Sequence, residues 1–314
     1  MSTEVLSAPV RVTDANHTEL QDAHEPDFAL ESLTEEELAF LKGQTGIQDD
    51  NGLKEHITNI QSDAMVVHPY GCIRHFVFTK LKISRLPAYR QMMKLAKERQ
   101  GAVFLDIGCC FGNDVRKAVA DGFPAQNAIG SDLHPEFWQL GQRLFGILPE
   151  QDPVKFLPGD ALNTAFLEAV APFSSPPTSP RPEISSLTTL NPLRGHVSAI
   201  HASAFFHLFD EVGQLELARS LAGLLSPEPG SIIFGAHNGQ AEKGVLKGPS
   251  LHITTKNMFC HSPGSWVAMW DGVVFEKGKV KANAFLFALK EEEVNLGQGN
   301  SDQFHQLVWS VVRL

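Results

Sequence analysis

The sequence predicts a doubly wound α/β domain, built on a mostly parallel seven-stranded sheet and preceded by an N-terminal helical extension. Two observations predict this fold. From Ala102 onward, apolar runs of four to six residues alternate with segments of helical periodicity, as in successive βαβ units. The last two apolar runs, 281–290 and 305–314, have no predicted helix between them. They are therefore expected to pair as an antiparallel hairpin at the sheet edge.

The N-terminal part divides into a tail and a helical region. Residues 1–27 lack the apolar pattern of a core and are expected to be disordered. Residues 28–101 are expected to form a helical lid region. Its first helix is predicted to begin at a cap, Ser32 or Thr34, and to end at Gly43. An irregular aromatic segment follows, and then a helix over about 87–100.

Residues 102–314 are predicted to form the main domain. The expected parallel strands cover 102–108, 127–133, 154–162, 197–203 and 230–237, and the expected helices cover 113–122, 135–146 and 210–226. The Pro- and Ser-rich stretch 171–192 contains too many proline rings for regular structure, so it is expected to form a surface loop. A short helix over 262–273 is predicted with Ser262 as its cap and Pro263 in its first turn.

Composition narrows the classes of partner. The chain has 314 residues, of which 43% are apolar and 20% charged, as is usual for a globular protein. Its net charge of −10 provides no strong positive field for a phosphate backbone, so nucleic acid is not expected as a partner. No uncharged apolar run reaches membrane-spanning length, and the four cysteines lack the spacing of a disulfide framework or zinc site. These features predict a cytoplasmic protein without a membrane partner.

A glycine-containing turn, "LDIGCCFGND", follows the first predicted strand. Ligands of open parallel sheets settle at the carboxyl ends of the strands, where the strand order reverses. Asp106 and Gly108 lie at such an end, and neither Gly108 nor Gly112 carries a Cβ that would keep a ligand away from the backbone. The amides that open the next helix can meet an anionic group there. This turn is therefore predicted to bind a cofactor, with Asp106, Gly108 and Gly112 as contacts.

Two further acids end the next two predicted strands. Asp132 follows Asp106 by 26 residues, a position from which a carboxylate can accept both hydroxyls of a ribose. Asp160 is placed to accept the exocyclic amine of an adenine, and Leu133 and Ala161 are expected to pack near the faces of that base. Three acids at successive strand ends favour a nucleoside that carries an amino acid over a pyrophosphate.

The adjacent Cys109 and Cys110 allow a redox or metal site as the alternative. Adjacent cysteines rarely reach disulfide geometry, and no further ligand lies close in the sequence. We therefore interpret them as filling a turn that faces a ligand, and expect no metal.

Four motifs resemble one enzyme family: "LDIGCCFGNDVRK", "GSDLHPEFWQLGQRLF", "ASAFFHLFD" and "HSPGSWVAMW". They are similar to the class I, Rossmann-like S-adenosylmethionine (SAM) methyltransferases, and more narrowly to fungal enzymes of meroterpenoid and polyketide pathways, some of which esterify a carboxylic acid. The segments "TEEELAFLKGQTG" and "PYGCIRHFVF" resemble the N-terminal region of that group, so the likeness covers roughly residues 32–314. The resemblance implies SAM as the cofactor and a small molecule as the methyl acceptor, and it is compatible with a homodimer. Cys110 departs from the class pattern, which has glycine at this position.

Two histidines flank the fourth predicted strand, where this fold places groups that face the methyl donor. His201 is a candidate for contact with the cofactor or the substrate, and His207 is a candidate general base. A buried histidine of the core or of a cap is the alternative for each. Proton removal matters only for a phenol or hydroxyl acceptor, because a carboxylic acid is already ionised near neutral pH.

Five other residues are candidates for binding the acceptor. Tyr70 and Arg74 belong to the segment expected to fold over the mouth of the site. His261, Trp266 and Trp270 belong to the last predicted helix or precede it, and the two tryptophans lie four residues apart on one face. Packing into the core is the alternative for these residues.

The predicted function is that of a SAM-dependent O-methyltransferase acting on a carboxyl or hydroxyl group of a terpenoid or aromatic polyketide-type metabolite. Methylation of a halide, thiol or nitrogen acceptor is an alternative within the same fold. A SAM-binding protein without catalysis, docking partners through residues 171–192, is another.

Overall fold

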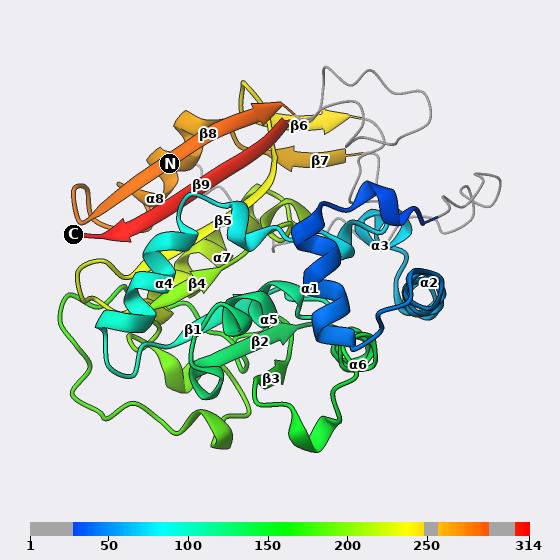
Figure 1. The fold of residues 1–314 in the computed structure, drawn as a ribbon. Helices are drawn as coiled ribbons and strands as arrows, with labels where there is room; N and C mark the ends of the chain where they lie inside the picture. Colours follow the sequence, from blue (N-terminus) through cyan, green and yellow to red (C-terminus); the bar gives the residue numbers. More distant parts are fainter. Residues whose placement is uncertain (1–27, 248–256, 289–304) are drawn as a thin grey trace.

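One seven-stranded sheet forms the centre of the molecule (Figure 1). The computed structural model describes residues 28–247, 257–288 and 305–314, so the predicted disorder of 1–27 concerns a segment outside the described residues. The strand order is β3-β2-β1-β4-β5-β9-β8, in which β1 to β5 are parallel and β9 is antiparallel to both β5 and β8. The strands are β1 Phe104–Ile107, β2 Ala128–Asp132, β3 Lys155–Pro158, β4 Ala199–His201, β5 Ile232–Gly239, β8 Val280–Ala288 and β9 His305–Arg313. The predicted doubly wound sheet and its C-terminal hairpin are confirmed.

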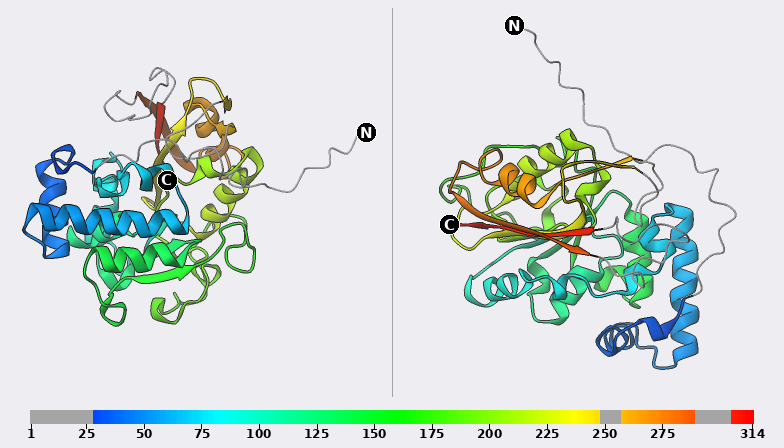
Figure 2. Two further views of the ribbon diagram at one scale, coloured as in Figure 1. Left: turned by 90° about the vertical axis from the view of Figure 1, so that its right-hand side faces the viewer. Right: turned by 90° about the horizontal axis from the view of Figure 1, so that it is seen from above.

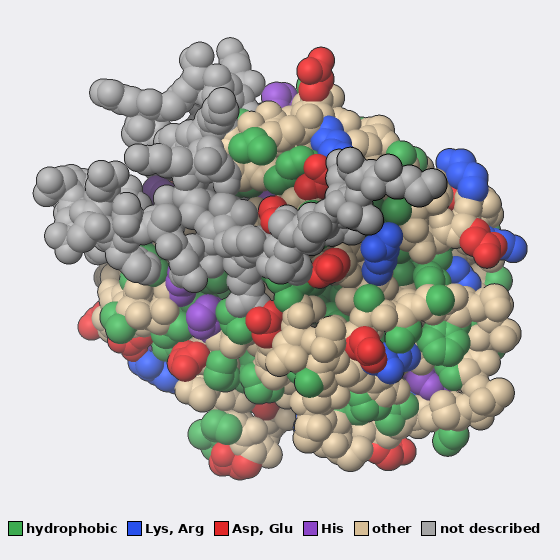
Figure 3. All heavy atoms as spheres, turned by 180° about the vertical axis from the view of Figure 1, so that it is seen from behind, with side chains coloured by type: hydrophobic (Ala, Val, Ile, Leu, Met, Phe, Trp, Pro, Cys, Tyr) green, Lys and Arg blue, Asp and Glu red, His purple; other side chains and the backbone are tan. Residues whose placement is uncertain are grey.

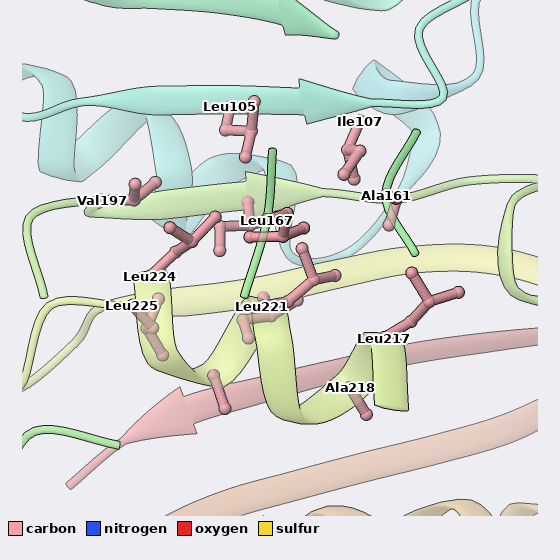
Figure 4. Packing of buried hydrophobic residues seen from close by; sticks show 14 of the residues in the cluster. Leu105, Ile107, Ala161, Leu167, Val197, Leu217, Ala218, Leu221, Leu224 and Leu225 are labelled. Atoms are coloured by element: carbon pink, nitrogen blue, oxygen red, sulfur yellow. The ribbon is translucent and has the colours of Figure 1, made fainter. Parts of the chain in front are cut away.

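Helices cover both faces of this sheet. The α-helices of the described residues are α1 Glu35–Thr45, α2 Asp50–Val67, α3 Gly71–Arg74, α4 Tyr89–Glu98, α5 Asn113–Ala120, α6 Pro135–Leu144, α7 Glu211–Leu224 and α8 Pro263–Trp270. Of these, α1 to α3 belong to the N-terminal region. Successive side chains of β1 alternate between the two faces. Leu105 and Ile107 join the cluster that contains α7 and α8, and Figure 4 shows their side chains above Leu217 and Leu221 of α7. Phe104 packs on the other face with residues of α4 and α5.

The N-terminal region packs against α6 of the main domain in a separate hydrophobic cluster. Leu53 and Ile57 of α2 pack with Phe137 and Leu144 of α6, and α1 contributes the buried Leu41. Figure 2 shows α1 and α2 (blue) at one side of the molecule. Because α6 follows β2 directly, this packing places the N-terminal region beside the carboxyl ends of the strands.

Four features differ from the sequence predictions. Helix α1 continues past Gly43 to Thr45, and Gly46, with φ +75°, ends it. Helix α2 was not predicted, although its buried side chains recur at helical spacing. A second sheet, β6 (Gly244–Lys247) paired with β7 (Asn257–Cys260), was also missed. The Pro-rich stretch has a partly buried end, since Ile184, Leu187 and Leu190 pack into the main core.

The remaining helix predictions agree with the structure. Thr34 forms a capping box with Glu37, and Ser262 caps α8, which has Pro263 in its first turn.

No helix within the described ranges is long and apolar enough to span a bilayer. Figure 3 shows acidic and basic side chains interspersed on the face turned away in Figure 1.

The extension of α1 through Gly43 can be tested by Gly43→Ala. A Cβ at this position meets nothing within 4 Å, so alanine should raise the free energy of unfolding by about 0.5–1 kcal/mol through helix propensity. The matched control, Gly46→Ala, should lower it by about 1–2 kcal/mol, because alanine is strained at the left-handed φ of +75°. Urea unfolding followed by circular dichroism measures both. A destabilising Gly43→Ala would mean that the helix ends where the sequence suggested.

Candidate active site

A cavity of about 360 Å³ lies at the carboxyl ends of β1, β2 and β4. Strand order reverses between β1 and β4, so this is the position where doubly wound sheets bind ligands. Its lining includes most of the residues predicted to bind the cofactor, namely Asp106, Gly108, Cys110, Asp132, Leu133, Ala161 and His201. His207 and Tyr70 also line it. The tertiary structure thus brings most of the predicted residues to one cavity, whereas Gly112 and Asp160 are not part of its lining.

The turn after β1 is held in a conformation that few residues adopt. Gly108, Cys110 and Gly112 all have positive φ, of 71°, 49° and 74°. A Cβ on Gly108 would approach Phe205 to 2.6 Å, and one on Gly112 would approach Arg116 to 2.3 Å. Glycine is therefore required at both positions for conformation and space. Cys110 adopts a left-handed conformation that is unfavourable for a residue with a Cβ, and this is how the departure from glycine is accommodated.

Asp106 and His201 form a buried pair that joins β1 to β4. Asp106 Oδ1 lies 2.8 Å from His201 Nδ1, and His201 Nε2 lies 2.7 Å from Ser203 Oγ. Burial alone would lower the pKa of His201, but the Asp106 carboxylate and its hydrogen bond outweigh burial and raise that pKa. The second carboxylate oxygen of Asp106, Oδ2, is buried and has no hydrogen-bond partner. Asp106 lines the cavity, but Oδ2 itself is enclosed, so the side chain contributes the negative charge of its carboxylate to this end of the cavity.

Asp132 both supports the turn and lines the cavity. Its Oδ2 accepts a hydrogen bond from the amide of Cys110 (2.8 Å), and its Oδ1 accepts one from the amide of His134 (3.0 Å). Burial raises the pKa of Asp132, and these amide hydrogen bonds oppose the rise. The carboxylate thus fixes the strained residue of the turn.

Asp160 lies differently from the other two acids. Its Oδ1 accepts a hydrogen bond from the amide of Leu162 (2.9 Å), as a turn-capping aspartate does. Its neighbours Gly159 and Ala161 line the cavity, but Asp160 itself is not part of that lining. Asp106 and Asp132 therefore converge on the cavity, and the third strand contributes through the residues beside Asp160.

His207 has a defined hydrogen-bonding arrangement at the cavity wall. Its Nδ1 accepts a hydrogen bond from the backbone amide of Asn238 (3.2 Å). A ring nitrogen that accepts cannot carry a proton, so the ring is neutral and its hydrogen is on Nε2. In this state Nε2 is a donor rather than a base, contrary to the role of proton acceptor considered for His207.

Known proteins are similar in sequence to this chain over most of its length. The N-terminal domain of the meroterpenoid methyltransferases matches residues 25–79. The asnovolin E/chermesin D methyltransferase nvfJ of Aspergillus novofumigatus is 32% identical over 80% of this chain and 81% of its own. The methyltransferase ausD of Penicillium brasilianum is 30% identical over 71% of each chain.

The chain belongs to this family of fungal methyltransferases. Membership confirms the predicted enzyme class, a methyltransferase. Among solved structures, a SAM-dependent methyltransferase from Mesorhizobium loti aligns with a TM-score of 0.42 and 14% identity, over 74% of this chain and 100% of its own.

The family's N-terminal domain supplies one wall of the cavity. Tyr70 lines the cavity and its ring packs near His68 and His134, whereas Arg74 lies outside the lining. Sequence reasoning missed further lining residues from this region and its contacts: His68, Cys72, Phe78, Lys80, Lys82, Asn113, His134 and Phe137. Two of them are basic residues in a segment without regular periodicity, so only the tertiary structure reveals that they face the site.

The remaining acceptor-binding candidates lie away from this cavity. Trp266 and Trp270 are fully buried in the core with Phe206 and Trp309, and His261 is buried against Trp266. None of these three candidates is part of the cavity lining. Their aromatic rings thus pack the face of the sheet that α7 and α8 cover.

The two cysteines of the turn are protonated thiols. Burial raises the pKa of Cys109 and Cys110 well above the ordinary value, so neither is a thiolate near neutral pH. Within the described ranges, no cluster of three or more His, Cys, Asp or Glu side chains is arranged to hold a metal ion.

Replacing Asp132 by alanine should weaken SAM binding at least about tenfold. The change removes both a cavity-lining acceptor and the bond that holds the Cys110 amide, a loss of about 1.5–3 kcal/mol for a charged group. Isothermal titration calorimetry with SAM measures it. Asp160→Ala is the matched control and should weaken binding less, because that carboxylate caps a local turn. Equal losses in the two variants would contradict the placement of the site.

Proposed function

We propose that this methyltransferase transfers the methyl group of SAM to the oxygen of a carboxylate on a small apolar acid of the terpenoid or aromatic polyketide type. The product would be a methyl ester. The observation that carries the proposal is that neither of the two histidines beside β4, His201 and His207, presents a basic nitrogen for deprotonating a hydroxyl acceptor. A carboxylic acid is ionised near neutral pH and needs no base.

The hydrogen bonds of the two histidines support this choice. Both ring nitrogens of His201 are engaged, one with Asp106 and the other with Ser203. The Ser203 hydroxyl also accepts from the amide of Ala236 (3.1 Å), so its own hydrogen remains available for His201 Nε2. His207 carries its hydrogen on Nε2, because Nδ1 accepts from Asn238. A phenol, whose pKa is about 10, would lack a proton acceptor among these groups.

The residues of the cavity fit SAM. The Asp106 carboxylate would attract the ammonium of the methionyl part through its negative charge, and the turn through Gly108 lets that part approach the backbone. Asp132 would accept from the ribose hydroxyls, and Leu133 and Ala161 would pack on the faces of the adenine. Asp160 would act through the turn that it caps. These assignments follow the order of the strands across the cavity.

Catalysis in this cavity would rest on alignment. SAM supplies an electrophilic methyl group on a positively charged sulfur. The chain's own task is to hold the acceptor oxygen in line with that methyl group and to keep water out, which can account for about 7–11 kcal/mol of the barrier. Aromatic side chains at the wall, including Phe78, Phe137 and Phe205, provide apolar surface for this purpose. The neutral His207 ring adds no charge to this wall.

The names of the relatives favour an acceptor of this class. The relative nvfJ is named an asnovolin E/chermesin D methyltransferase, and the alignment covers 81% of its chain. The methyltransferases phiE and atr3 are named O-methyltransferases, with identities to this chain of 32% and 33%. These likenesses support an oxygen acceptor on a secondary metabolite.

The pH dependence of turnover tests the acceptor class. With a carboxylic acid substrate, kcat/KM should vary less than about threefold between about pH 6 and pH 9, because the acid is ionised throughout. With a phenol analogue of the same skeleton, kcat/KM should rise with pH, because only the phenolate reacts. Mass spectrometry should find a product 14 Da heavier that alkali hydrolyses, a figure that is about the mass of one CH₂. An alkali-stable product from the preferred substrate would overturn the proposal in favour of an ether, amine or thioether.

A second test replaces His207 by glutamine, whose amide keeps one donor and one acceptor. If the ring only donates a hydrogen bond, kcat should fall less than about tenfold, because a general base would contribute about 10²–10⁴. Single-turnover assays of both proteins at matched saturation provide the measurement. A loss of 100-fold or more, rescued at high pH, would identify His207 as a base and contradict the carboxylate proposal.

A further inference from the structure

The cavity wall includes one lysine whose charge is not neutralised locally. Lys82 and Lys80 both line the cavity. The Lys80 ammonium donates to the carbonyl of Ser32 and lies 3.9 Å from Glu37. Within the described part of the chain, Lys82 forms no hydrogen bond or ion pair through its side chain. It is half-buried among cavity residues, so its ammonium can meet an anionic group of a ligand.

The backbone on both sides of Lys82 is fixed by carboxylates. The amide of Leu81 donates to Oε1 of Glu37 (3.1 Å), a side chain only 1% exposed that also pairs with Arg85 at 2.7 Å. The amide of Ile83 donates to Oδ1 of Asp114 in α5 (2.9 Å). One helix of the N-terminal region and the helix after the glycine turn therefore hold the same short segment. Holding a segment in this way is typical of a functional side chain that must not move.

The charges around Lys82 match an amino acid zwitterion. Asp106 and Asp114 line the same cavity, and Oδ2 of Asp106 has no partner. Lys82 and Cys110 of the turn line the same cavity. The methionyl end of SAM carries one ammonium and one carboxylate. An acidic side chain can bind the ammonium and a lysine can bind the carboxylate, so the charges of the cavity complement those of the ligand.

We propose that Lys82 binds the α-carboxylate of SAM, so that the N-terminal region completes the cofactor site in addition to covering it. This inference rests on the cofactor site proposed above. Glu37 and Asp114 act as positioning residues, because they hold the segment from which Lys82 reaches the cavity.

Calorimetry with SAM and decarboxylated SAM tests the inference, because the two ligands differ only in the carboxylate. The full-length wild type should prefer SAM. Lys82→Met should weaken SAM binding by about 10- to 100-fold, the loss of one charge-assisted hydrogen bond. Its affinity for decarboxylated SAM should stay the same or rise, because that ligand is more positive and Lys82 repels it. Lys94→Met, which removes an exposed lysine of α4 outside the cavity lining, is the matched control and should keep the wild-type preference.

The outcomes separate this inference from the function on which it rests. Equal weakening for both ligands, or an unchanged preference in Lys82→Met, would overturn the role of Lys82 while the cofactor site stands. An unchanged SAM affinity with a raised KM for a carboxylic acid substrate would also overturn it and assign Lys82 to the acceptor. Failure of the wild type to bind either ligand would remove the cofactor site itself. Circular dichroism melting curves verify that the variants fold.

Glu37→Ala tests positioning. If Glu37 only stabilises the fold, the variant should melt at a lower temperature and keep its preference for SAM over decarboxylated SAM. If Glu37 positions Lys82, the preference should decrease at temperatures where the protein remains folded. Retention of the full preference would overturn the positioning role.

Discussion

The buried hydrogen bond between Asp106 and His201 is the interaction on which the site depends. It joins β1 to β4 at the position where the strand order reverses, and both side chains are almost fully buried. Removing one partner of such a pair leaves an uncompensated polar group, which typically costs about 3–5 kcal/mol. Because Asp106 is buried and bonded to His201, it acts on the cavity mainly through the charge of its carboxylate. The pair thus determines both the cohesion of the sheet centre and the polarity of the cavity.

The turn after β1 connects this buried pair to the rest of the site through hydrogen bonds. Of the three residues with positive φ, only Cys110 carries a Cβ and is strained, and Asp132 holds it through its amide. The first turn of α5 then binds the N-terminal region: Asn113 donates to the carbonyl of Phe78, and Asp114 accepts from Ile83. The cofactor turn and the family's N-terminal domain are therefore one connected structure. The cavity gains a wall that the doubly wound sheet alone lacks.

The hydrogen bonds of the histidines illustrate how context determines chemistry. His201, His207 and His237 are all buried beside the central strands, yet their environments differ. His201 faces a carboxylate that raises its pKa, whereas burial lowers the pKa of His237 to about 3 while its Nδ1 accepts from Trp309. His207 is fixed as a neutral donor by a backbone amide. Residue type alone does not distinguish these three roles.

The sequence by itself determined the order and type of the sheet strands and the residues at their ends. Apolar runs, glycine positions and capping residues are local signals, so the C-terminal hairpin, the cap at Thr34 and the cavity positions of Asp106 and Asp132 could be predicted. Only the tertiary structure decided the rest. Side-chain burial placed Trp266 and Trp270 in the core, and long-range hydrogen bonds brought Lys82 to the cavity and made His207 a donor. These outcomes depend on partners distant in the sequence, which no local pattern encodes.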